Sequence, residues 1–257
     1  MLVRDYNTLR AYAKAYAEGH ISLLIVKGEG GLGKTYNLQK AMEEQDHILF
    51  NGHATPLSVY LRLFNNPTAR VIFDDVDSLL ANKTTVSILK QLCESNKIKV
   101  VRYDSTARIN QMEIPKEIRC TNNTCLLCND MKKFGKNMKA LLTRAVYLEF
   151  VPTKEEVMRE LKEFPELDQE VFAFILEHLA ALSHINFRLY MKAVELKKAK
   201  LDWIEYINGE LSINLELELI MEIMDLPKKE RNQIWKDKTG RHIRTLQRKI
   251  REISETI

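Results

Sequence analysis

Short apolar runs, each about five residues long, recur along the chain between longer stretches that carry apolar residues at helical spacing. Runs of this length that end in polar or turn residues are typical of buried strands. Amphipathic stretches between them are typical of helices that cover a sheet. The pattern predicts an α/β fold built on a five-stranded parallel sheet. The predicted strands are 22–26, 47–51, 70–75, 124–130 and 146–150.

Several helices have recognisable start signals. Residues 1–20 predict an amphipathic helix, on which Tyr6 or Leu9 either lines an adenine pocket or packs against the sheet edge. A Thr-Pro pair predicts the start of a helix over Thr55–Leu63, and a further helix is expected over Thr84–Glu94.

The second half of the chain is predicted to be helical. Thr153 and Glu156 form a capping-box pattern that begins the first of three expected helices over residues 153–200. Beyond them, residues 213–224 form an acidic, apolar helical stretch, and two more helices follow on either side of a turn at Thr239-Gly240.

Composition narrows the class of protein. The 257 residues leave room for two or three small domains, and 45% hydrophobic with 29% charged residues is ordinary for a globular protein. No apolar run approaches the roughly 18 residues of a membrane span, and the N-terminus lacks a signal-peptide core. We therefore expect a cytoplasmic protein that does not act at a membrane.

The four cysteines do not indicate a disulfide scaffold. Cys120, Cys125 and Cys128 have a C-x4-C-x2-C spacing that occurs at some iron–sulfur sites. Two of the three lie in an apolar strand-like run, so we interpret them as structural residues.

The strongest chemical signal is a glycine-rich stretch after the first predicted strand. GEGGLGKT fits G-x-x-x-x-G-K-S/T, the phosphate-binding loop of nucleotide enzymes. Glycines allow successive backbone N–H groups to surround an anion, and the helix that follows adds its N-terminal dipole. Lys34 is expected to reach the β- and γ-phosphates of ATP, and Thr35 to ligate Mg²⁺. The predicted nucleotide-binding residues are Gly28, Glu29, Gly30, Gly31, Leu32, Gly33, Lys34, Thr35 and Tyr36.

A second motif is the apolar run Val71-Ile-Phe that ends in Asp74 and Asp75. In phosphate-loop enzymes an acid at this strand end faces the nucleotide. Asp74 is expected to hold Mg²⁺ through water, and Asp75 to orient or deprotonate the attacking water.

Two basic segments are candidates for contact with DNA. Residues 97–119 predict a β-hairpin or extended insertion, which either follows a nucleic-acid backbone or is simply a solvated hairpin. Its candidate residues are Lys99, Arg102 and Arg108.

The second basic segment is C-terminal, where residues 226–251 hold ten Lys and Arg against two acids, Glu230 and Asp237. Together with the helix-turn-helix pattern this clustering indicates a surface for DNA phosphates, although a basic bundle that docks on a neighbouring subunit or on RNA has the same composition. The expected contacts are Arg241, His242, Arg244, Thr245 and Arg248.

Taken with their order and spacing, the phosphate loop GEGGLGKT, the run VIFDD and the strand CLLCN resemble the AAA+ ATPases over about residues 1–200. The resemblance implies a helical lid and assigns three further residues. Asn129 would be sensor 1, which orients the lytic water. Arg144, in ALLTRAVYLEF, would be the arginine finger that reaches a neighbouring subunit's γ-phosphate, and Arg188 would be the sensor 2 arginine.

The same resemblance implies a homo-oligomer, a ring of hexameric type or a filament, that binds and hydrolyses Mg²⁺-ATP between subunits. We expect residues 1–151 to form the ATPase domain, 152–205 the lid and 206–257 the helix-turn-helix. A DNA transaction in replication or in a mobile element, with a replication or recombination protein as partner, is the first functional hypothesis.

Two alternatives depend on one departure from the family. AAA+ members usually carry Asp-Glu where this chain has Asp74-Asp75, and the shorter side chain would sit further from the water. Asp-Asp also occurs in superfamily 3 helicases, which resemble this chain in having a basic hairpin before sensor 1. The alternatives are such a helicase, or an ATP-dependent scaffold on DNA that hydrolyses slowly.

Overall fold

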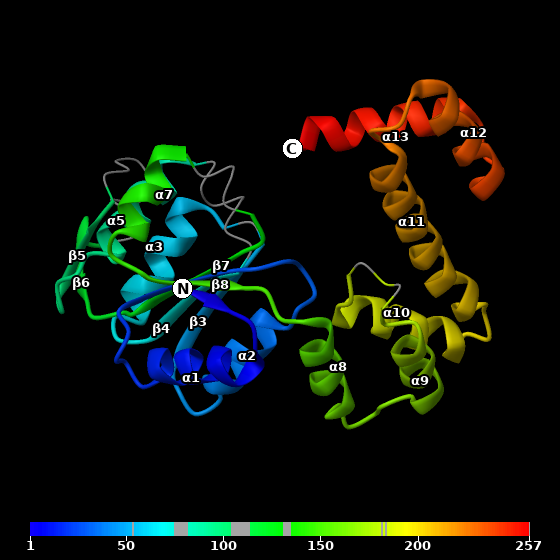
Figure 1. Cartoon of the computed structure of the whole chain (residues 1–257). Helices are drawn as coiled ribbons and strands as arrows, with labels where there is room; N and C mark the ends of the chain where they lie inside the picture. The colour runs from blue at the N-terminus through cyan, green and yellow to red at the C-terminus, as the bar shows by residue number, and fades with distance from the viewer. Residues whose placement is uncertain are drawn as a thin grey trace. The chain divides into compact units, whose positions relative to one another are not determined.

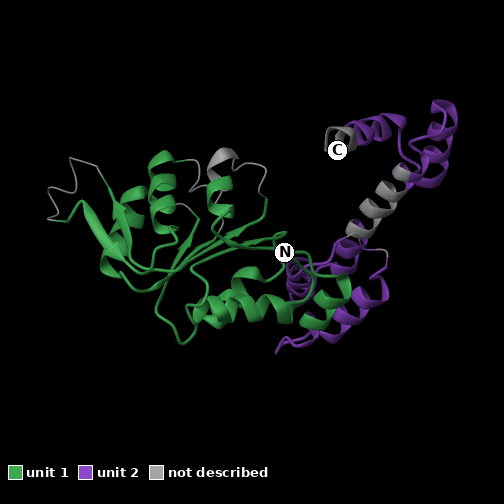
Figure 2. Cartoon of the chain, turned by 60° about the vertical axis from the view of Figure 1, so that its left-hand side comes forward, with its two compact units in different colours: residues 1–160 green, residues 161–257 purple. Residues whose placement is uncertain are grey.

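The computed structural model describes residues 1–52, 54–74, 82–103, 114–130, 135–180, 182 and 184–256. Within the helices, the side chains of residues 135–138, 210–218, 221 and 252–256 fall outside the description. The chain divides into two compact units, Met1–Glu160 and Leu161–Ile257, which Figure 2 colours separately.

The first unit is organised around a parallel sheet, which has six strands in the described residues instead of the five expected. The strand order is β1-β8-β2-β7-β4-β3, and all pairings are parallel. The additional strand is β1, which pairs Val3 with Phe150 at the sheet edge, so residues 1–20 begin as a strand before the helix. The strands are β1 (Leu2–Val3), β2 (Leu23–Lys27), β3 (His47–Asn51), β4 (Arg70–Asp74), β7 (Thr124–Cys128) and β8 (Val146–Phe150).

Helices cover both faces of this sheet. Figure 1 shows α1 and α2 on one side and α3, α5 and α7 on the other. The apolar core between the sheet and α3 and α5 contains stacked Phe50 and Phe73, whose ring centroids are 4.7 Å apart. These helices are α1 (Tyr6–Ala17), α2 (Lys34–Ala41), α3 (Pro56–Asn65), α5 (Lys83–Leu92) and α7 (Gly135–Leu142).

The start signals of two expected helices have the predicted geometry. Thr55 caps α3 by accepting a hydrogen bond from the Ser58 backbone N–H at 3.2 Å, and proline occupies the first turn. Thr153 accepts a hydrogen bond from the Glu156 backbone N–H at 3.2 Å at the start of α8 (Lys154–Lys162).

A two-stranded antiparallel ribbon lies outside the main sheet. It consists of β5 (Lys99–Arg102) and β6 (Glu117–Cys120), which form the two arms of the hairpin expected over residues 97–119. Residues 104–113, which connect the arms and include Arg108, lie outside the described residues.

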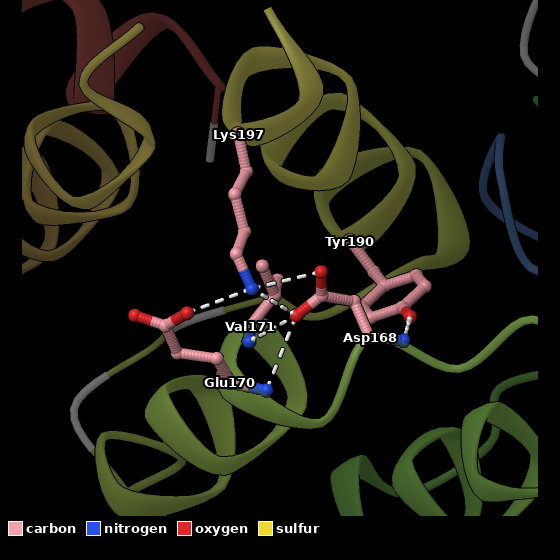
Figure 3. Close-up of polar contacts among 5 residues, drawn as sticks. All are labelled: Asp168, Glu170, Val171, Tyr190 and Lys197. Atoms are coloured by element: carbon pink, nitrogen blue, oxygen red, sulfur yellow. Dashed lines mark hydrogen bonds and ion pairs between the residues drawn. The ribbon is translucent and has the colours of Figure 1, made fainter. Parts of the chain in front are cut away.

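Polar contacts join α9 (Gln169–Glu177) and α10 (Phe187–Lys198) in the second unit. The Lys197 ammonium lies 2.7 and 2.9 Å from the two Asp168 carboxylate oxygens and 2.7 Å from Glu170 Oε2 (Figure 3). The Asp168 backbone N–H donates to the Tyr190 hydroxyl at 2.7 Å. With α8 these form the three helices expected over residues 153–200.

The last three helices are α11 (Trp203–Ile223), α12 (Lys228–Thr239) and α13 (Ile243–Thr256). Helix α11 is continuous through residue 206, so the expected boundary between lid and C-terminal domain falls inside a helix. Its first residue, Trp203, packs edge-to-face on Phe174 of α9, whereas its last turns share a core with Trp235 of α12 and Leu246 of α13. Across the described residues, no helix combines the length and hydropathy that a membrane span needs.

Candidate functional site

The phosphate loop connects β2 to α2 at the carboxyl edge of the sheet. Gly31 and Gly33 have φ angles of 81° and 73°, the left-handed region in which glycine is favoured. Gly28 is required for a different reason, because a Cβ there would lie 2.6 Å from the Phe150 carbonyl oxygen. The loop therefore has the glycine-dependent conformation that its motif predicts.

Lys34 is nearly buried, and its ammonium lies inside the loop. It donates to the carbonyl oxygens of Gly28 at 2.6 Å and Glu29 at 2.7 Å. It also donates to Asn129 Oδ1 at 3.1 Å, which brings together two residues that are far apart in the sequence. Asn129 follows β7, in which Cys128 pairs with Lys27 of β2, so both residues lie at the same edge of the sheet.

The candidate metal ligands are also adjacent. The Thr35 hydroxyl donates to Asp74 Oδ2 at 2.9 Å, and Asp74 ends β4 at the edge where the phosphate loop begins. A hydroxyl and a carboxylate are oxygen ligands of the type that Mg²⁺ takes beside a nucleotide. Asp75, the candidate for orienting water, lies outside the described residues.

Arg144, one of the two arginines assigned from the family resemblance, lies away from this edge. Arg144 is exposed and precedes β8, whose first residue Val146 pairs with Leu24 near the start of β2. Each strand residue advances about 3.3 Å, so the length of β8, about 15 Å, separates Arg144 from the edge that holds the phosphate loop. Arg188 is exposed on the first turn of α10, in the second unit.

The residues proposed for adenine contact are core residues. Tyr6 and Leu9 are both buried, and the Tyr6 ring packs edge-to-face on Phe150 with centroids 5.1 Å apart. The Tyr6 hydroxyl donates to the Leu32 carbonyl at 3.2 Å, and burial raises its pKa. Tyr36, by contrast, is exposed, with the Lys40 ammonium 5.9 Å from the centroid of its ring.

The expectation that Lys99 contacts DNA is wrong, because this residue is buried. Its side chain is only 2% exposed, and its ammonium donates to the Asn122 carbonyl, so it has no surface to offer to phosphate. Burial lowers the pKa of this ammonium. Arg102, on the same strand, is exposed and pairs with Glu117 at 2.9 Å.

The expected C-terminal contacts lie at the start of α13. Arg241, His242, Arg244 and Arg248 are exposed, and Thr245 is half-buried. Gly240 ends α12 with a φ of 65°, as a left-handed helix cap. The His242 imidazole Nδ1 accepts a hydrogen bond from the Arg244 backbone N–H at 3.2 Å, so this residue also caps the helix.

All four cysteines are buried free thiols. Burial raises the pKa of Cys93 to about 12, so this thiol is inert near neutral pH. Among the described residues, no group of three or more His, Cys, Asp or Glu side chains is placed to hold a metal ion.

The sequence motifs predicted Lys34, Thr35, Asp74 and Asn129 as site residues, but they did not indicate the polar residue that packs behind the loop. Asn37 is buried in α2 and donates through Nδ2 to the Gly33 carbonyl at 2.9 Å. The sequence feature that could have indicated this role of Asn37 is its position, since it is a polar residue inside the predicted helix, three residues after Lys34.

No protein-family model matches the chain. An uncharacterized 36.7 kDa protein from the nrdC-mobD intergenic region of Enterobacteria phage T4 is 25% identical over 173 residues, which cover 60% of this chain and 53% of that protein. The chain thus spans about half the length of this relative.

Solved structures with a similar chain path share little sequence with it. A DNA replication initiation factor is 15% identical, with a TM-score of 0.46 over 84% of this chain and 65% of that one. The replication initiator DnaA bound to AMPPCP and single-stranded DNA is 16% identical, with a TM-score of 0.45 over 86% and 68%. NtrX from Brucella abortus in complex with ADP is 15% identical, with a TM-score of 0.47 over 74% and 48%. The interpretation of the site therefore depends on the residues of this chain.

Proposed function

We propose that this protein is an oligomeric, Mg²⁺-dependent ATPase of the AAA+ type that acts on DNA in replication or in mobile-element transactions, as a loader, motor or target-selection ATPase. The observation that carries the proposal is the meeting of three motifs at one sheet edge. Thr35 contacts Asp74 at 2.9 Å, and Lys34 contacts Asn129 at 3.1 Å.

Each of these residues has a role in the proposed reaction. Lys34 and the backbone N–H groups of the loop bind the phosphates, and Thr35 and Asp74 would hold Mg²⁺, which would neutralise charge on the β- and γ-phosphates. Asp75 and Asn129 would place the attacking water. Arg144 of a neighbouring subunit would complete the site, and Arg188 would contact nucleotide from the lid.

The DNA-binding part of the proposal is supported by the C-terminal helices. A core around Trp235 and Leu246 packs α12 against α13, and the turn at Gly240 leaves Arg241, Arg244 and Arg248 exposed. Exposed arginines at the start of a helix in a helix-turn-helix suit phosphate contacts, which make binding depend on salt concentration.

Steady-state ATP hydrolysis by the full chain, alone and with single- or double-stranded DNA, tests this function. We expect turnover that requires Mg²⁺ and rises about tenfold with one form of DNA. Lys34→Ala is the matched negative control, because it removes the ammonium inside the loop. Absence of both nucleotide binding and turnover in the unsubstituted protein would overturn the proposal.

Two alternatives predict different results. A superfamily 3-like helicase would displace a DNA strand without any other protein and would lose this activity when the hairpin residue Arg102 is replaced. An ATP-dependent scaffold would assemble on DNA with a non-hydrolysable ATP analogue and show negligible turnover, as the Asp74-Asp75 pair favours.

A further inference from the structure

Helix α1 is linked to the phosphate loop at two consecutive carbonyl groups. The Tyr6 hydroxyl donates to the Leu32 carbonyl at 3.2 Å. The next carbonyl, Gly33, accepts from the Asn37 backbone N–H at 3.0 Å and from Asn37 Nδ2 at 2.9 Å. Asn37 Oδ1 in turn accepts from Arg10 Nε at 3.0 Å. Asn37 is only 3% exposed, so water cannot easily replace either of these partners.

These contacts, together with the backbone hydrogen bond from Asn37, restrain the direction of the phosphate-binding donors. A trans peptide plane directs its C=O group and the following N–H group to opposite sides. A hydrogen bond to the Leu32 carbonyl therefore restrains the direction of the Gly33 backbone N–H group. Hydrogen bonds to the Gly33 carbonyl restrain the Lys34 backbone N–H group in the same way. Gly33 has a φ of 73°, and glycine has few steric restraints of its own, so outside contacts matter more for its orientation.

The other end of the Arg10 guanidinium reaches a different helix. Its Nη2 donates to the Glu160 carboxylate in α8, and the Glu160 side chain is 14% exposed. Arg10 Cζ also lies 5.9 Å from the centroid of the Tyr6 ring. A single planar guanidinium thus joins Asn37 of the phosphate-loop helix to the last residue of the first unit.

We propose that Arg10 is a positioning residue for nucleotide binding, which links the Gly33 peptide plane to α8 through Asn37 and Glu160. The proposal rests on the proposed function, because it assumes that the phosphate loop holds ATP. It assigns part of the nucleotide affinity to a contact with α8, so a change at Glu160 is transmitted to the phosphate donors. The guanidinium itself touches no reacting atom.

Titration of the full chain with a fluorescent ATP analogue tests this. We expect Arg10→Ala to raise Kd about tenfold, as for loss of one charge-assisted hydrogen bond, and Glu160→Gln about threefold. The double variant should bind no more weakly than Arg10→Ala, because both changes break the same chain of contacts. Lys14→Ala is the matched control on the same helix. Among the described residues the Lys14 ammonium has its ion pair with exposed Glu18, at 3.8 Å, so the Kd of this variant should not change.

Thermal unfolding of the same variants separates positioning from a merely structural role. If the variants unfold at lower temperature but bind the analogue as tightly as the unsubstituted protein, Arg10 is structural and the proposal is overturned. If Arg10→Ala does not fold, the Arg10→Lys variant tests the proposal instead, because an ammonium keeps the charge but cannot bridge Asn37 and Glu160. An unchanged Kd of the Arg10→Lys variant would again overturn the proposal. Failure of the unsubstituted protein to bind the analogue would instead overturn the proposed function as well.

Discussion

At the scale of the residue, Gly28 is a position of the phosphate loop that leaves no room for a side chain. An alanine Cβ there would lie 2.6 Å from the Phe150 carbonyl oxygen, which belongs to the backbone of β8 and cannot turn away. We expect Gly28→Ala to cost about 1–3 kcal/mol of unfolding free energy, as overpacking usually does, and to weaken ATP binding. Urea unfolding and nucleotide titration would measure both effects.

Gly209→Ala provides the control for this prediction. Gly209 lies within α11, and a Cβ added there would meet nothing within 4 Å. Alanine is favoured over glycine inside a helix by roughly 0.5–1 kcal/mol, so this variant should be unchanged or more stable. Equal unfolding midpoints for the two variants would contradict the close approach at Gly28.

The sequence predicts residues whose chemistry needs a fixed motif, and it predicts poorly those whose role depends on surroundings. Lys34, Thr35 and Asp74 were predicted because phosphate binding requires these residue types at this spacing, and the structure brings Thr35 and Asp74 within 2.9 Å of each other. Lys99 was assigned to the surface because of its charge, yet it is buried. The Asn122 carbonyl accepts a hydrogen bond from its ammonium, which satisfies this group away from water. Arg10 belongs to no sequence motif, because folding alone brings it into contact with Asn37 and with Glu160.

At the scale of the element, His242 combines a helix cap with an expected DNA contact. Its Nδ1 accepts from the Arg244 N–H, so the cap requires an unprotonated Nδ1. We expect His242→Ala to destabilise α13 by about 1 kcal/mol and to weaken DNA binding. His242→Asn should restore the stability, because asparagine also caps, but not the full DNA affinity. Recovery of both in the asparagine variant, by circular dichroism and DNA titration, would leave His242 as a cap only.

The junction of α9 and α10 gives a prediction about pH. Burial opposes ionisation of Asp168, but hydrogen bonds from Lys197 and from the Val171 and Glu170 backbone N–H groups outweigh it and lower the carboxyl pKa. Hydrogen bonds to Asp168 and then to Glu170 raise the pKa of the Lys197 ammonium.

These directions set a pH window. The stabilisation from Asp168 is present above the pKa of this carboxyl in the unfolded chain, about 3.9, and is lost as pH falls through its lower pKa in the folded chain. The stabilisation from Lys197 is lost only at high pH, as pH rises through a folded-state pKa that lies above about 10.4. We expect Asp168→Asn, which keeps the α9 cap, to lower the urea midpoint at pH 7 and to match the unsubstituted protein near pH 2. A difference that persists at pH 2 would contradict this. Asp168→Ala should cost about 1 kcal/mol more, through loss of the cap.

The sequence pattern failed to predict one short strand and the start of one helix. Strand β1 has only two residues, too few to display any period, and it exists because Val3 pairs with Phe150 at the sheet edge. Helix α11 was predicted only from residue 213, because Gly209 interrupts the helical pattern, whereas packing of Trp203 on Phe174 extends the helix back by ten residues, from residue 213 to residue 203. Tertiary contacts decided both cases.

At the scale of the whole molecule, the place of Arg144 leads to a prediction about assembly. Arg144 is exposed at the amino end of β8, whereas the phosphate loop lies at the carboxyl end of the parallel neighbour β2. An arginine at the opposite edge cannot serve the loop of its own chain. If it is catalytic, it must act on another subunit. Arg144→Ala should therefore abolish hydrolysis. The Kd for ATP should change by no more than about twofold, which is small beside the tenfold change that about 1.4 kcal/mol would cause.

Mixing two inactive variants tests this in the assembled protein. Lys34→Ala removes the ammonium from the loop, and Arg144→Ala removes the guanidinium that a neighbour would supply. With equal amounts and random assembly, about a quarter of the interfaces pair an intact loop with an intact arginine, so about a quarter of normal turnover should return. An arginine that acts within its own chain would restore none. Because neither variant alone has a complete site in this scheme, recovered turnover would place ATP hydrolysis at the contact between subunits and make assembly a condition of activity.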